Sequence, residues 1–233
     1  MENNMKFTEG YWLLSERTNG QFASQAYHIE AMENGLRVVA PTSPVLSRGD
    51  TLNRPTITIE FLAVSPEVIS VRAWHYEGYR TGEARFEKKE TTCDAVVTIT
   101  ENEAVLDAGR VSVHVDRKNW GYSFWADGKL LTSSGFHNLG YVRWDKRVSS
   151  MLPQDNYMKE HEYTPYMTQD LLLAPGENVY GFGERFTAFV KNGQAVETWN
   201  EDGGTASQVA YKNIPFYMTN SCLLYTSPSP RDS

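Results

Sequence analysis

Two carboxylates, an amide and an indole occur together on one short stretch near the C-terminal end of the chain. Residues 199–204 read Trp-Asn-Glu-Asp-Gly-Gly, so that Glu201 and Asp202 directly follow Trp199 and Asn200 and precede a pair of glycines. The glycines predict a loop, and loops held on a rigid scaffold are where binding groups collect. The stretch is therefore a candidate binding site, and a plain surface turn is the competing interpretation.

A glycine-bracketed aromatic residue precedes this stretch. Gly181 and Gly183 flank Phe182, and the charged residues Glu184 and Arg185 follow. Because no third glycine opens a helix, the pattern is not a dinucleotide-binding fingerprint. We expect the glycines to serve packing at a strand end, and Glu184 and Arg185 to form a structural ion pair.

Other catalytic chemistry has no signal in the sequence. The five histidines are scattered and lack the spacing of a metal site. No nucleophile elbow, phosphate-binding loop or zinc motif occurs. We therefore predict no metal and no cofactor.

Composition narrows the class of partner. The 233 residues carry a net charge of -7, which argues against nucleic acid and against an anionic membrane surface. The first residues contain no apolar run of signal-peptide length, and no stretch reaches the roughly 18 apolar residues of a membrane span. Cys93 and Cys222 are the only cysteines and imply no disulfide framework. We expect a cytoplasmic protein with no nucleic-acid or membrane partner. Its many aromatic residues agree with sugar binding and equally with an ordinary β-protein core.

Hydrophobic residues alternate with polar ones through most of the chain, which predicts half-buried strands. The clearest strands are expected at residues 56–61, 68–74, 95–99 and 110–115. Turn signals separate them, and Asp127-Gly128 predicts a hairpin while Asn192-Gly193 predicts a tight turn. A long loop is expected from about residue 143 to 166. The pattern indicates an all-β sandwich or barrel.

The end of the chain differs in kind from the rest. Residues 222–232 read Cys-Leu-Leu-Tyr-Thr-Ser-Pro-Ser-Pro-Arg-Asp, which matches at every position the in-frame translation of a common transposon-library sequencing adapter. We therefore expect residues 221–233 to be a read-through artefact, and the natural domain to occupy residues 1–220. A disordered tail is the alternative interpretation.

Residues 177–220 resemble a known family closely. Gly-Glu-Arg-Phe-Thr-Ala at 183–188, the run from Asn192 to Thr205 and Tyr-Lys-Asn-Ile-Pro-Phe-Tyr-Met-Thr-Asn at 211–220 are similar to the N-terminal domain of family 31 glycoside hydrolases, in its α-xylosidase branch. Looser similarity upstream extends the resemblance over residues 5–220. It implies a galactose-mutarotase-like β-sandwich, here incomplete at its C-terminal end, and a following (β/α)₈ barrel that holds both catalytic aspartates.

The resemblance also assigns roles to the candidate loop. It implies that the loop reaches over the barrel mouth, with Asp202 as a sugar-hydroxyl ligand and Trp199 and Asn200 as supporting substrate-binding residues. Glu201 stands where relatives often carry Arg. The pair Glu201 and Asp202 is not expected to be catalytic, because adjacent residues on one loop rarely converge on a single bond. No catalytic residue is predicted in this chain, and the chain alone is expected to be inactive.

The function expected from the resemblance is that of an N-terminal piece of a retaining α-glycosidase. Its partners would be an α-xyloside or α-glucoside and the barrel of its own chain, and a homo-oligomer stays open. The choice between α-xylosidase and α-glucosidase also stays open. The alternative is a free-standing carbohydrate-binding or domain-docking β-sandwich without catalysis.

Overall fold

The structure is a computed structural model that describes residues 6–10, 12–52, 54–77, 93–145, 163–201, 210–221 and 224–226. It is 54% strand and 2% helix, which confirms the all-β prediction. Among the described residues the one helical element is the short 3₁₀ turn η1, Arg48–Thr51. Nothing helical in this part of the chain has the length and apolar character needed to cross a membrane.

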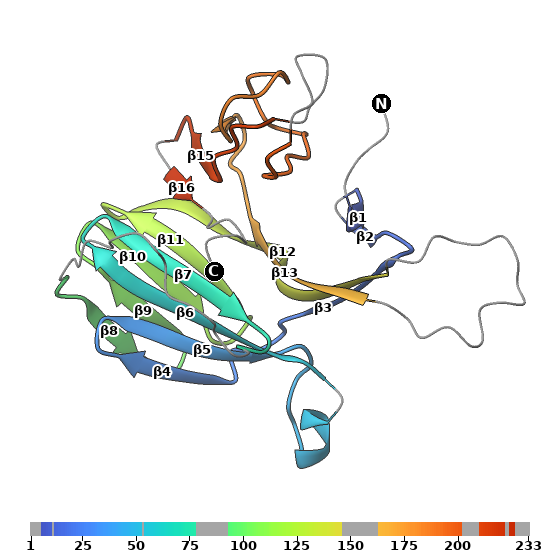
Figure 1. Ribbon diagram of the computed structural model, residues 1–233. Coiled ribbons are helices and arrows are strands. Elements are labelled where there is room, and N and C mark those ends of the chain that lie inside the picture. Colours follow the sequence, from blue (N-terminus) through green and yellow to red (C-terminus); the bar gives the residue numbers. More distant parts are fainter. Residues whose placement is uncertain are drawn as a thin grey trace, which may run out of the picture. The chain divides into compact units, whose positions relative to one another are not determined.

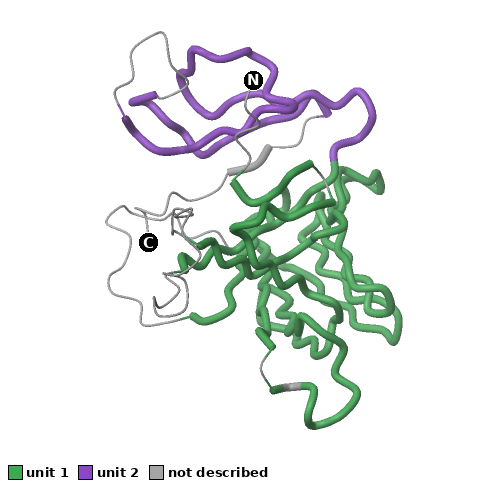
Figure 2. The backbone as a smooth tube through the Cα atoms, turned by 90° about the vertical axis from the view of Figure 1, so that its right-hand side faces the viewer, with its two compact units in different colours: residues 1–77, 91–172 green, residues 78–90, 173–233 purple. Residues whose placement is uncertain are grey.

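The chain divides into two compact units (Figure 2). Unit 1 comprises Met1–Glu77 and Thr91–Leu172, and unit 2 comprises Gly78–Glu90 and Leu173–Ser233. Each unit is described by itself below.

Unit 1 contains two antiparallel sheets and a short pair of strands (Figure 1). The four-stranded sheet has the order β4-β5-β6-β7, with strands His28–Met32, Gly35–Pro41, Thr56–Ser65 and Val68–Trp74. The seven-stranded sheet has the order β13-β12-β11-β10-β9-β8, and β3 pairs with β12. Its strands, from β8 to β13 and then β3, are Val96–Ile99, Glu103–Asp107, Val111–Asp116, Gly121–Ala126, Lys129–Asp145, Tyr163–Leu171 and Thr18–Phe22. The short pair is β1, Thr8–Glu9, with β2, Leu13–Leu14.

The two sheets of unit 1 enclose one hydrophobic core. In β6 every second side chain is buried, namely Ile57, Ile59, Phe61 and Ala63, as the period of two along a strand requires. Phe61 meets the facing sheet through the ring of Tyr122, with centroids 5.4 Å apart. The predicted strands at 56–61, 68–74 and 110–115 are thus confirmed as strands of a sandwich.

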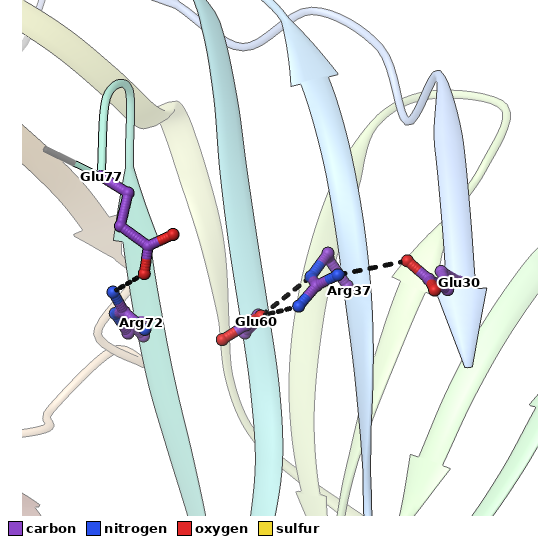
Figure 3. A network of polar contacts seen from close by, with 5 residues as sticks. All are labelled: Glu30, Arg37, Glu60, Arg72 and Glu77. Atoms are coloured by element: carbon purple, nitrogen blue, oxygen red, sulfur yellow. Dashed lines mark hydrogen bonds and ion pairs between the residues drawn. The ribbon is translucent and has the colours of Figure 1, made fainter. Parts of the chain in front are cut away.

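One charged group is buried on the opposite face of β6. Glu60 of β6 is only 5% exposed, and its Oε1 accepts hydrogen bonds from Nε and Nη2 of Arg37 on β5, at 2.8 and 2.7 Å (Figure 3). Nη1 of Arg37 also donates to Glu30 on β4 at 3.3 Å. The carboxylate raises the pKa of Arg37 above its ordinary value, and the two hydrogen bonds to Oε1 satisfy a charge that would otherwise be costly to bury.

The Asp-Gly hairpin signal is confirmed. Asp127 and Gly128 join β11 to β12 with φ of +50° and +75°, the two left-handed positions that a type I′ turn requires. Gly193 likewise has φ of +72° beside Asn192.

The predicted loop at 143–166 is wrong at both of its ends. Strand β12 continues to Asp145, and β13 begins at Tyr163, with Pro165 paired to Arg143. Proline is tolerated there because β13 is the edge strand of its sheet, where no neighbour needs its missing N–H. The polar residues that suggested a loop are explained by the exposure of this ribbon, in which most side chains of β13 are only partly buried. The rest of the expected loop, residues 146–162, lies outside the described residues.

Unit 2 contains a small antiparallel sheet of three strands, β14-β15-β16, at Val179–Gly181, Phe216–Thr219 and Leu224–Thr226. The sheet brings the glycine-bracketed segment 181–183 next to the strand that follows the candidate loop.

Candidate functional site

The candidate loop begins and ends at one place in unit 2. Asn200 and Ala210 form a parallel bridge, and the backbone N–H of Glu201 donates to the carbonyl of Ala210 at 3.0 Å. The chain therefore enters and leaves segment 202–209 at adjacent points.

Asn213 holds the two ends of the loop together. Its Nδ2 donates to the carbonyl oxygens of Trp199 and Ala210, both at 2.6 Å, and to Oδ1 of Asn200 at 3.0 Å. Its backbone N–H donates to the same Oδ1 at 3.1 Å. One amide side chain thus bonds three residues from both sides of the loop, so hydrogen bonds hold the ends of the loop together.

Arg185 orients this amide. Its guanidinium donates to Oδ1 of Asn213 and to the carbonyl oxygens of Glu197 and Phe182, the last through Nε at 3.1 Å. Because Arg185 occupies the oxygen of Asn213, the amide nitrogen must point toward the loop. Burial lowers the pKa of Arg185 from its ordinary value.

The glycine-bracketed segment lets the backbones approach closely. Gly181, Phe182 and Gly183 have φ of +120°, +69° and +83°, and a Cβ on Gly183 would lie 2.2 Å from the carbonyl oxygen of Lys212. The N–H of Phe182 donates to Phe216 O at 2.8 Å. Only glycine fits at 181 and 183, which agrees with the predicted packing role at a strand end.

The prediction that Glu184 forms an ion pair with Arg185 is wrong. Glu184 instead pairs with Lys212, Oε2 to Nζ at 3.1 Å, while Arg185 bonds carbonyl and amide oxygens of unit 2. Neighbouring residues in an extended or turning chain point apart, so sequence adjacency did not identify the contact.

The predicted site residues fall into three situations. The side chain of Asn200 is committed to Asn213, which agrees with a supporting role. Trp199 offers its carbonyl to Asn213 while its side chain is 55% exposed. Asp202 lies outside the described residues, so its role as a sugar ligand stays a prediction. In the described part of the chain no group of three or more His, Cys, Asp or Glu residues could hold a metal ion.

Sequence reasoning missed three supporting residues. Asn213 and Arg185 hold the loop, as described above, and Lys191 is 7% exposed with Nζ bonded to Thr187 Oγ1 and Ala188 O at 2.9 and 2.6 Å. Burial and the nearby charge of Arg185 lower the pKa of Lys191. The bond between Arg185 and Asn213 spans 28 residues of sequence, and no local pattern indicates it.

The two packed antiparallel sheets of unit 1 make the protein a β-sandwich protein. Comparison with known proteins then places it in a family. Residues 57–226 match the model of the glycosyl hydrolase 31 N-terminal galactose mutarotase-like domain. The chain belongs to this family, and the resemblance drawn from the sequence is confirmed.

Two curated relatives are α-xylosidases. The chain is 37% identical over 222 residues to α-xylosidase XylQ of Lactiplantibacillus pentosus and 32% identical over 226 residues to the α-xylosidase of Emericella nidulans. Each match covers 93% of this chain but only 26% and 28% of the relative. The chain thus spans about a quarter of the length of these enzymes.

Solved structures share the fold at low sequence identity. The cycloalternan-forming enzyme of Listeria monocytogenes, in complex with a pentasaccharide substrate, superimposes with a TM-score of 0.61 at 14% identity, covering 88% of this chain and 17% of that one. The GH31 α-xylosidase of Xanthomonas citri gives a TM-score of 0.55 at 15% identity, covering 82% and 18%. At these identities the likeness shows the fold alone.

Proposed function

We propose that the chain is the N-terminal β-sandwich portion of a retaining α-glycosidase of α-xylosidase type, which releases α-linked xylose from non-reducing ends. The similarity to two α-xylosidases over 93% of the chain supports this substrate class. α-Glucoside substrates are the neighbouring alternative within the same reaction.

The contribution of this chain to the reaction would be a substrate-binding loop. The observation that supports this role is the pair of loop ends held by Asn213 through Asn200 and Ala210. A binding group is effective when its support is rigid, and this clamp fixes Asn200, two positions before Asp202. In this proposal the carboxylate of Asp202 accepts charge-assisted hydrogen bonds from sugar hydroxyls.

The bond-breaking groups would come from elsewhere in the enzyme. Retention requires two carboxyl groups about 5–5.5 Å apart on either side of the scissile bond, and no pair in this chain is assigned that role. The family resemblance implies a catalytic barrel, which needs about 250 residues. That barrel is the proposed partner of the loop, and the 233-residue chain alone should not hydrolyse a xyloside.

The test uses the longest protein encoded at the same locus, assayed with an α-xyloside that releases a chromophore. Asp202→Asn should lower kcat/KM by about tenfold to a hundredfold, the range expected for a hydrogen bond to a charged group. The matched control Glu201→Gln changes the adjacent carboxylate and should stay within about twofold of the unchanged enzyme. Equal effects of the two substitutions would contradict the assignment of Asp202.

We also propose that residues 1–220 form the natural domain and that residues 221–233 are translated adapter. The match of residues 222–232 to the adapter supports this division, although the family match and strand β16 both extend to residue 226. Genomic sequence that departs from the chain at residue 221 is the expected result. A genome that encodes the same thirteen residues would refute it.

The cytoplasmic location expected from the sequence likewise stays a prediction.

A further inference from the structure

A hollow of about 260 Å³ lies on unit 1, where the turns that follow β9 and β11 come together. Strand register shows that it opens on the face of the sheet that points away from the core. Val113 of β10 is fully buried and pairs with Phe124. Because side chains alternate, the preceding pair, Ser112 and Trp125, faces the other way. The lining includes Asp107, Arg110, Ser112, His114, Trp125 and Asp127.

An aromatic ring forms one wall of the hollow. Trp125 is held in place by a hydrogen bond from its Nε1 to Ser123 Oγ at 2.9 Å. The ring of His114 lies beside it, with centroids 5.6 Å apart. A fixed indole presents a flat apolar face at low entropic cost.

The polar groups around this ring are also held in place. Nδ1 of His114 lies 2.8 Å from Glu103 Oε1, and its Nε2 lies 3.1 Å from Ser112 Oγ. At the rim, Arg110 pairs with Glu67 and Asp127, at 2.5 and 3.2 Å. The rim therefore offers a cationic donor and anionic acceptors side by side on the exposed edge of the hollow.

The balance of charge selects the kind of ligand. The lining has two carboxylates, Asp107 and Asp127, against the one guanidinium of Arg110, and Glu67 neutralises that guanidinium further. A phosphate or other anion would meet net negative charge, and an organic cation would meet Arg110. A neutral ring with several hydroxyl groups can use both donors and acceptors while its apolar face covers the indole, as mostly apolar sites with a few placed polar groups do.

We propose that this hollow is a second carbohydrate site, which binds one ring of a neutral sugar against Trp125. It goes beyond the proposed function, because it lies within unit 1 and uses no residue of the loop in unit 2. Its role would be to bind a neutral saccharide independently of that loop. The residues that decide the binding are Trp125 for stacking, with Arg110 and Asp127 for the hydroxyl groups.

The test follows the indole N–H signals of the full 233-residue chain, labelled with ¹⁵N, during titration with methyl α-D-xylopyranoside. The six tryptophans give six signals, and Trp125→Phe identifies the signal of Trp125. That signal should shift in a saturable way, while the signal of Trp12, an exposed residue in the same unit, should not. Trp125→Leu should weaken the binding, measured on the ligand by saturation transfer, by about fivefold or more because the stacking face is lost. Trp12→Leu is the matched control and should leave the affinity unchanged.

Several outcomes would overturn the proposal. A shift confined to Trp199 would place all sugar binding at the loop, which would support the proposed function and remove this site. No shift at any tryptophan, or a response of Trp125 to tetramethylammonium but not to the xyloside, would also refute it. Loss of binding in Trp125→Leu counts only if the remaining indole signals keep their positions, which shows that the variant is folded.

Discussion

Asn213 and Asn200 are joined by two hydrogen bonds, from the side-chain amide and the backbone N–H of Asn213 to the same Oδ1, at 3.0 and 3.1 Å. The contact ties the residue two positions before Asp202 to the segment between the loop and β15. Because Arg185 fixes the amide of Asn213 from the other side, the loop ends are held by a continuous set of polar contacts.

Replacement of the amide should loosen the loop ends. Asn213→Ala removes three side-chain hydrogen bonds to the loop and should lower the free energy of unfolding by about 1–3 kcal/mol. Hydrogen exchange at the Glu201 N–H, which donates to Ala210 O, should become faster. Asn220→Ala is the control, since Asn220 also bonds backbone groups of unit 2 but at Asn178 and Gly176. Unchanged exchange at Glu201 in Asn213→Ala would show that the amide does not hold the loop.

The close approach at Gly183 should tolerate no side chain. Gly183→Ala should destabilise the protein by about 2–4 kcal/mol, because the new Cβ collides with Lys212 O in addition to the strain of positive φ. Gly193→Ala has a similar φ but open space around it, so only the strain of about 1 kcal/mol should be seen. Urea unfolding of the two variants measures the difference, and equal losses would mean that the collision is relieved by a backbone shift.

The aromatic contact across the sandwich should dominate the stability of unit 1. Phe61 is fully buried and lies near the rings of Tyr122 and Phe124, so Phe61→Ala should cost about 3–5 kcal/mol. Val68→Ala in the neighbouring strand, where Val68 is 50% exposed, should change the free energy of unfolding by less than about 0.5 kcal/mol. Thermal and urea unfolding both measure these changes in the free energy of unfolding. A small loss for Phe61→Ala would indicate that the two sheets do not share a core.

Asp116 should stabilise the fold at neutral pH. Hydrogen bonds from the backbone N–H of Asn119, followed by those from its side chain and from Lys118, lower the pKa of Asp116 below its ordinary value of 3.8. The native state therefore binds this proton less tightly than the unfolded state. The stabilisation is present above pH 3.8 and is lost as pH falls through the lowered pKa. Asp116→Asn should be less stable than the unchanged protein at pH 7, and urea unfolding at successive pH values should show the gap closing in acid.

Asp170 should destabilise the fold at neutral pH. It lies in β13 opposite the irregular part of β12, between the paired residues Gln169 and Leu171, and loss of hydration by burial raises its pKa, although His137 partly offsets this. The native state then binds the proton more tightly, so stability falls as pH rises from the ordinary value of 3.8 through the raised pKa. Asp170→Asn should be more stable than the unchanged protein at pH 7 and show no gain well below pH 3.8. A loss of stability at pH 7 would mean that the charged form is favoured by its surroundings.

Much of the fold follows from local patterns in the sequence. Alternation in residues 56–61 places Ile57, Ile59 and Phe61 on one face of a strand, and Asp127-Gly128 specifies a turn that few other pairs can form. These features depend on neighbours within a few residues, so composition and period are enough to predict them. The expected loop at 143–166 failed at its ends because an edge strand with two partly exposed faces has no alternation, and because an edge position accepts Pro165.

The sequence by itself determined the all-β class, the positions of the main strands and, through the motifs of residues 177–220, the family and the candidate loop. Only the tertiary structure decided which residues hold that loop. Asn213 reaches Asn200 across thirteen residues, Arg185 reaches Asn213 across twenty-eight, and Glu184 pairs with Lys212 rather than with its neighbour. Such contacts depend on which strands lie side by side, and that arrangement is set by burial of the whole sheet rather than by any local pattern.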